Sequence, residues 1–231
     1  MSIQSLIASV RLELKALGLI YVVPFIAGFF TLLFSLFFHI NGLRDTMHVI
    51  PPIEMILPVF AAWNTVFYMS LVFDDVLCEV IFSFPNPIWK LVFSRLLIIF
   101  ISYSLFIAGV VLIAQFISGT TLFPSLFFQI SGQSLFYIGL ATLSMCFFSN
   151  VNYSLSVVAI YLCVQVLTQG SVMPLINVYL FNNRVQETSF ILIWSIKQIF
   201  LSLALFILSY TIAKNKFSRT NIGAYFRKKN Y

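Results

Sequence analysis

Long apolar runs, separated by short polar stretches, dominate the pattern of this chain. A run of about 18 or more apolar residues is long enough to cross a bilayer as a helix. Six runs meet that length, and they predict spans at 17–40, 53–73, 91–117, 125–148, 154–173 and 190–213. The pattern therefore predicts an all-α polytopic membrane protein, with one transmembrane domain over residues 1–231.

The segment before the first span has a different periodicity. In residues 2–16 the apolar side chains recur at helical spacing, while Gln4, Arg11 and Lys15 lie off that face. Such a helix suits the membrane interface, where its basic residues meet lipid headgroups. The alternative is that these residues simply begin the first span.

Residues 170–189, before the last span, form a second exception. Their apolar half is too short to cross a bilayer and too apolar for an ordinary loop. We therefore expect a re-entrant or interface-lying segment there, on the external side.

Composition and charge support a membrane protein and indicate its orientation. The chain is 61% hydrophobic and 9% charged, with a mean hydropathy of +1.01, which a soluble domain could not bury. Six spans place both termini on one side, and 10 of the 13 basic residues fall there. Positive-inside logic makes that side the cytoplasm, with 214–231 as a basic cytoplasmic tail. The basic residues behind the net charge of +6 lie beside the spans, so they indicate membrane lipid and not nucleic acid as a partner.

The stretch between spans two and three concentrates charge and proline. As a helix, residues 74–84 would place Asp75 and Glu79 opposite an apolar face, and Pro85 would end it. We expect a short amphipathic helix on the cytoplasmic surface. The alternative is an ordinary loop whose charges keep it in water.

These residues resemble a motif of type-2 ABC exporter permeases, in which acids, a glutamate, a proline and a later lysine follow span two. Glu79 matches the glutamate, Pro85, six positions later, matches the proline, and Arg95 stands at the lysine position. Asp74 and Asp75 supply the upstream acids, whereas the family's Gly-Thr-Leu is replaced by residues 76–78. The resemblance extends to the six spans, the amino-terminal amphipathic helix and the re-entrant segment.

The resemblance implies a function as well as a fold. The helix over 74–84 would be a coupling helix that docks on a cytoplasmic ATPase subunit, which binds ATP and Mg²⁺. This chain would pair with a second copy or a homologue in a bacterial cell membrane. Its compact size resembles permeases of peptide export and antimicrobial-peptide immunity. Exporters of lipids, glycans, drugs or haem are alternatives within the family.

Motifs for other classes of protein are missing from the sequence. No G-x-x-x-x-G-K-[ST] occurs, so nucleotide binding by a P-loop is not expected. Neither H-E-x-x-H nor G-x-S-x-G occurs, and His39 and His48 have no carboxylate at metal-motif spacing. We therefore expect no catalytic site, cofactor or metal in this chain. An ATP-independent transporter or channel is less well supported, since neither internal repeats nor several intramembrane acids are present.

A few polar residues enter the predicted spans and are candidates for a substrate path. They are Glu54, Lys197, Gln165, Gln169 and Gln198. Intramembrane charges are costly and commonly functional. Glu54 and Lys197 both fall toward the external side, where they would pair or line an exit path. The alternative for Lys197 is that it extends outward to the headgroups.

Overall fold

The computed structural model describes residues 18–41, 49–73, 88–181 and 186–219. These residues form six long helical spans and include no β-strand. The spans are η1 (Gly18–Val22) with α2 (Val23–Ile40), α3 (Ile50–Phe73), α5 (Ile88–Ser118), α6 (Ser125–Phe148), α7 (Val151–Thr168) and α8 (Thr188–Arg219). Each is long and apolar enough to cross a bilayer, so the architecture is that of a multi-pass membrane protein.

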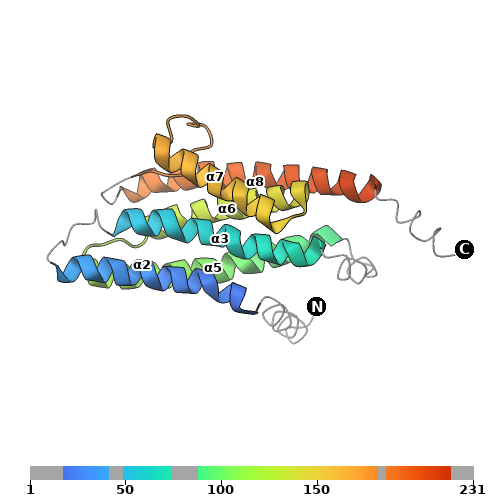
Figure 1. The fold of residues 1–231 in the computed structure, drawn as a ribbon. Helices are drawn as coiled ribbons and strands as arrows, with labels where there is room; N and C mark the ends of the chain where they lie inside the picture. The colour runs from blue at the N-terminus through green and yellow to red at the C-terminus, as the bar shows by residue number, and fades with distance from the viewer. Residues whose placement is uncertain (1–17, 42–48, 74–87, 182–185, 220–231) are drawn as a thin grey trace, which may run out of the picture.

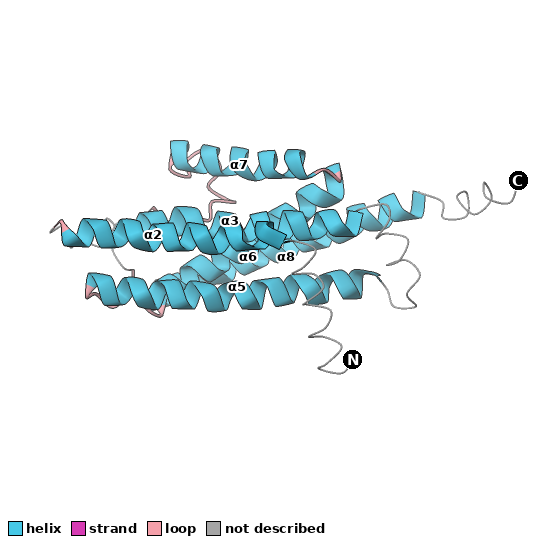
Figure 2. Cartoon of the chain, turned by 60° about the horizontal axis from the view of Figure 1, so that its bottom comes forward, coloured by secondary structure: helices cyan, strands magenta, loops and turns pink. Residues whose placement is uncertain are grey.

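The helices run side by side, with α6 at the centre (Figure 1). Most of α6 is buried, and it packs against α3, α5, α7 and α8. In contrast, α7 lies at the edge and contacts only α3 and α6 closely, as Figure 2 shows. We call the end where α3, α6 and α8 begin the Glu54 end. The opposite end, where α2 begins and α8 ends, is the termini end.

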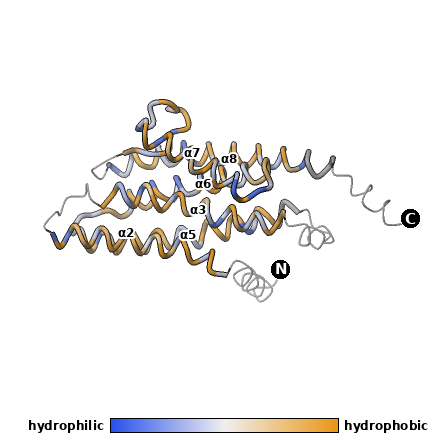
Figure 3. Tube along the Cα trace, in the orientation of Figure 1, coloured by the Kyte–Doolittle hydropathy of each residue, from blue (hydrophilic) through white to orange (hydrophobic). Residues whose placement is uncertain are grey.

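The bundle exposes apolar side chains to lipid and buries polar groups together with an apolar core. Figure 3 shows apolar residues along every helix, and many large apolar side chains of α2, α5 and α8 are exposed. The central α6 instead buries hydroxyl and amide groups, namely Ser125, Gln129, Ser131, Gln133, Ser134, Thr142 and Ser144. Apolar side chains gain nothing from leaving lipid, whereas polar groups gain partners inside the bundle.

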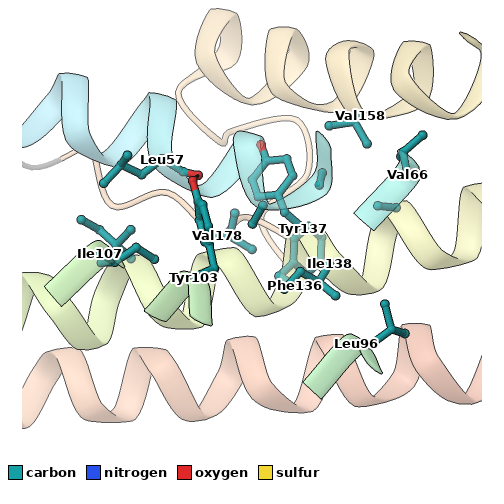
Figure 4. Packing of buried hydrophobic residues seen from close by; sticks show 14 of the residues in the cluster. Leu57, Val66, Leu96, Tyr103, Ile107, Phe136, Tyr137, Ile138, Val158 and Val178 are labelled. Carbon is teal, nitrogen blue, oxygen red and sulfur yellow. Dashed lines mark hydrogen bonds between the residues drawn. The ribbon is translucent and has the colours of Figure 1, made fainter. Parts of the chain in front are cut away.

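A long-range hydrogen bond fixes α3 against α5 next to a proline. The hydroxyl of Tyr103 in α5 donates to the carbonyl oxygen of Leu57 in α3 at 2.6 Å (Figure 4). Pro58, the next residue of α3, has no N–H group and cannot take part in the regular helix bonding. The tyrosine therefore fixes α3 to α5 directly beside the proline.

Helix ends follow local capping chemistry. Between α6 and α7, Ser149 adopts a left-handed conformation, and the Asn150 side chain accepts from the N–H of Asn152 at 2.9 Å. After α7, Gln169 and Gly170 are both left-handed, with φ of 48° and 76°. The Gly170 N–H donates to the carbonyl oxygen of Gln165, which closes the helix.

All six predicted spans are helices in the structure, and most of their ends lie within a few residues of the predicted positions. The span over 125–148 coincides with α6. The span over 154–173 is wrong at both ends, because Asn150 caps the helix earlier and Gln169-Gly170 end it at Thr168. Helix α8 continues to Arg219, so the predicted tail begins as helix. The predicted helices over 2–16 and 74–84 lie outside the described residues, and the re-entrant segment over 170–189 is described only in part.

Close contact between α6 and α8 depends on small residues. A Cβ atom added at Gly139 would lie 3.2 Å from Cβ of Leu205 and 3.3 Å from the carbonyl oxygen of Ser202. At Gly132 an added Cβ would collide with the Gln198 amide oxygen. Small residues at such positions let helix backbones approach within a membrane.

Replacing Gly139 by valine should therefore separate α6 from α8. We expect the free energy of unfolding in detergent to fall by about 1–3 kcal/mol, the usual cost of overpacking. Gly109 is a matched control, because it is an exposed helical glycine with nothing within 4 Å of an added Cβ. A denaturant titration of Gly139→Val that matched Gly109→Val would contradict this account of the interface.

Candidate functional site: a buried polar cluster at the Glu54 end

A buried carboxylate lies near the start of α3. Glu54 is 1% exposed, although the helix around it is apolar. Its Oε1 atom accepts hydrogen bonds from the Nε2 atoms of Gln129 and Gln133 in α6, both at 2.8 Å. Gln129 and Gln133 are four residues apart and so lie on the same face of α6. Side chains from two adjacent turns of α6 therefore bind a single carboxyl oxygen of α3.

A non-helical segment completes the site. We call residues 174–181 the strap, which leads from α7 toward α8. The N–H of Leu180 donates to Oε1 of Glu54 at 2.8 Å. The carbonyl oxygen of Val178 accepts from Nε2 of Gln133 at 2.9 Å and from Nε2 of Gln198 at 2.8 Å. The strap is thus bound through its backbone by α3, α6 and α8.

Lys197, in the first third of α8, also binds the strap. Its Nζ atom donates to the carbonyl oxygens of Pro174 at 3.3 Å and Asn177 at 3.2 Å. The same atom lies 4.4 Å from the centre of the Trp194 ring, a cation–π arrangement. Lys197 and Glu54 do not form an ion pair in the described structure, so of the two roles expected for them, pairing or lining an exit path, the second stays a prediction.

Three tyrosines extend the cluster toward α7. The hydroxyls of Tyr137 in α6 and Tyr179 in the strap are 2.6 Å apart, and the Tyr161 hydroxyl of α7 donates to the carbonyl oxygen of Ile176 at 2.6 Å. Burial raises the pKa of Tyr179 above its ordinary value, so this hydroxyl remains a neutral donor and acceptor. Figure 4 shows Tyr137 beside Val178 of the strap.

The two glutamines of α7 do not act together. Gln165 is fully buried, whereas Gln169 is exposed and forms the left-handed end of the helix. The predicted span over 154–173 includes both glutamines, whereas α7 ends before Gln169. The amide nitrogen and oxygen of Gln165 are buried and have no hydrogen-bond partner among the described residues.

Of the five candidate coupling residues, the structure describes one. Asp74, Asp75, Glu79 and Pro85 lie outside the described residues. Arg95 lies near the start of α5, is 5% exposed, and has contacts of its own. Since α5 begins at the termini end, Arg95 and the polar cluster lie at opposite ends of the bundle.

Sequence reasoning selected Glu54, Lys197 and Gln198, but it missed Gln129, Gln133 and the tyrosines. A signal for the glutamines was present, because Glu54 and Gln129 are each the fifth residue of helices that begin at the same end. Amide side chains at matching depth in neighbouring spans are natural partners for a buried carboxylate.

The cluster is a hydrogen-bonding site built around one carboxylate. It contains the Glu54 carboxyl group and four amide or indole donors, each bonded to that carboxyl group or to the Val178 carbonyl oxygen of the strap. Among the described residues no group of three or more His, Cys, Asp or Glu side chains is positioned to hold a metal ion. The described geometry thus ties the strap to α3, α6 and α8 through hydrogen bonds within the protein.

A scan against protein-family models, a search of curated proteins and a search of solved structures each found no match to this chain.

Proposed function

We propose that this chain is the membrane-spanning subunit of an ATP-driven ABC exporter. The observation that carries the proposal is the motif-like stretch Asp74, Asp75, Glu79, Pro85 and Arg95 between α3 and α5. The described ends of that stretch, Phe73 and Ile88, belong to helices that end and begin at the termini end. A coupling element at this end would face the side that carries most basic residues.

The physical logic of coupling supports the same assignment. An ATPase subunit must transmit its movement through a rigid element, and proline at the end of a short helix fixes its exit direction. Glu79 on the polar face offers an acid for a basic groove of the partner, which fixes register. Arg95 is buried near the start of α5, the helix that follows this stretch in the chain.

The assembly consists of two such chains, identical or homologous, and two ATPase subunits that bind ATP and Mg²⁺. The excess of basic residues supports cytoplasmic termini in a bacterial cell membrane. Under this orientation the Glu54 end is external. We also propose an interface helix over residues 2–16 and a re-entrant segment over residues 170–189.

The cargo is an amphipathic molecule, and a peptide is the preferred class. The polar cluster supports this choice, because its amide, carboxylate and tyrosine groups already bind peptide carbonyl and N–H groups of the strap. Lipids, glycans, drugs and haem are the alternative cargoes.

One observation favours a second candidate function. A buried intramembrane carboxylate such as Glu54 is typical of ion-coupled transporters, which need no ATPase. Flux driven by a proton gradient, in vesicles containing this chain alone, would favour that alternative over an ABC exporter.

The purified chain alone should hydrolyse no ATP, since no P-loop is present in its sequence. Hydrolysis should appear when the chain is co-purified with its ATPase subunit, and it should disappear again when that subunit is removed. A phosphate-release assay on both preparations makes the comparison. Turnover by the isolated polypeptide would refute the assignment as a permease subunit.

A further inference from the structure

The strap lies across the Glu54 end with its centre buried and its outer part exposed. Val178 and Tyr179 are 0% and 1% exposed, so they lie within the bundle, whereas Leu175 is 83% exposed. A non-helical segment at this depth needs partners for its backbone groups, since lipid supplies none. The strap therefore depends on the helices around it.

Those partners come from four different helices. Glu54 of α3 binds the Leu180 N–H, Gln133 of α6 and Gln198 of α8 bind the Val178 carbonyl, and Tyr161 of α7 binds the Ile176 carbonyl. Every one of these bonds uses strap backbone. Among these groups Glu54 is the only acid, and its Oε1 atom joins the strap to both glutamines of α6.

Both ends of the strap region have left-handed backbone. Gln169 and Gly170 precede it, and Phe181, at its far end, has a φ of 52°. A bulky residue adopts that conformation only when its surroundings impose it, and such strain commonly occurs in switching segments. Phe181 directly follows Leu180, so the bond from Leu180 to Glu54 holds the strained residue in place.

Hydrogen-bond donors and acceptors around the strap are also poorly matched in number. The Val178 carbonyl accepts from Gln133, Gln198 and the Trp194 indole, although an oxygen has two lone pairs. Meanwhile the Oε1 atoms of Gln133 and Gln198 are buried and receive no donor from the described residues. Buried polar groups without partners cost free energy. Lifting the strap would relieve this cost by admitting water or cargo.

We propose that the strap is a gate over the Glu54 end and that Glu54 is its latch. In the closed state the carboxylate holds the Leu180 N–H, and opening breaks that bond and exposes Val178 and Tyr179. The role as an exit gate for cargo rests on the proposed export function, whereas the latch itself does not.

Cysteine labelling tests the latch in liposomes that contain the chain alone, with water-soluble maleimide on both faces. The reporter is Val178→Cys, in a background with the three native cysteines replaced by alanine. Val66→Cys, at a fully buried site in the middle of α3, reports unfolding, and Leu175→Cys reports full access. With Glu54 present, the Val178 reporter should react far more slowly than the Leu175 reporter.

Glu54→Leu should raise the labelling rate of the Val178 reporter by about tenfold, because the opened strap becomes more populated when its latch is lost. The Val66 reporter should stay protected. Glu187→Leu is the matched control, since it removes an exposed acid beside α8 and should change nothing. An unchanged rate in Glu54→Leu would overturn the proposal, as would a Val178 reporter that is fully reactive with Glu54 present.

A second variant covers the case in which Glu54→Leu also exposes the Val66 reporter. Lys197→Met with Gln198→Leu removes strap contacts of α8 and leaves the bonds between Glu54 and α6 untouched. Faster labelling of the Val178 reporter alone would then support the gate, and unchanged labelling would overturn it. No ATPase or nucleotide is present, so failure here leaves the proposed export function intact.

Discussion

Replacing Glu54 by leucine should lower the free energy of unfolding by about 2–4 kcal/mol. The substitution leaves the buried donors of Gln129 and Gln133 and the N–H of the half-buried Leu180 without the acceptor they share. Each unpaired buried donor costs about 1–3 kcal/mol, although hydrogen bonds between membrane helices average only about 0.6 kcal/mol. Unfolding in detergent, titrated with a denaturing surfactant, measures the loss.

Removing the two glutamines that bind Glu54 should lower the free energy of unfolding by more than removing Glu54 itself. Gln129→Leu with Gln133→Leu leaves the Glu54 carboxylate buried with only backbone donors of the strap among the described groups, and a buried charge that loses its partners costs about 3–5 kcal/mol. Adding Glu54→Leu to that pair should recover part of the loss, because the stranded charge disappears. Effects that simply add across the three positions would show that the side chains do not form one network.

Glu187→Gln supplies the baseline for these measurements. Glu187 is an exposed acid immediately before α8, and its replacement should change the free energy of unfolding by no more than about 0.5 kcal/mol. A loss as large as that of Glu54→Leu would mean that any lost acid destabilises the chain, whatever its burial.

Reversing the charge of Glu79 should separate the chain from its ATPase subunit. In the proposed exporter this acid docks in a basic or hydrogen-bonding groove, and a lysine there would meet like charge. We expect at least about a tenfold fall in co-purified ATPase, which corresponds to about 1.4 kcal/mol of binding free energy. Membrane insertion and yield should be unchanged, because surface substitutions usually alter stability by less than about 0.5 kcal/mol.

Glu187→Lys is the matched control for Glu79→Lys. It makes the same charge reversal, but at the opposite end of the bundle, where α8 begins. The amount of co-purified ATPase should equal that of the unchanged chain. Equal losses in both variants would attribute the effect to net charge and remove Glu79 from the docking surface.

The spans could be predicted because apolar length is a local property of the sequence. Span four was bounded correctly by the polar stretches at 118–121 and 149–150, which end the apolar run on both sides. The end of α7 was misplaced because the apolar residues around Val172 continue past Gly170, which closes the helix. The sequence signal for this helix end is the glycine that follows the helical run.

The site was harder to predict than the spans. Glu54, Lys197 and Gln198 stand out because charged and amide groups are rare in apolar runs. Their partner is largely the backbone of the strap, and backbone carbonyl and N–H groups have no sequence signature. The bond between Leu180 and Glu54 also joins residues 126 positions apart, which no local pattern reveals.

The central claim is that this chain works as the membrane subunit of an ATP-driven exporter. The most direct measurement is the identity and stoichiometry of the polypeptides that co-purify with the tagged chain from its native membrane. We predict one P-loop ATPase subunit for each copy of the chain, and a loss of that subunit in Glu79→Lys. A chain that purifies without any P-loop protein, while still supporting transport in liposomes, would contradict the account.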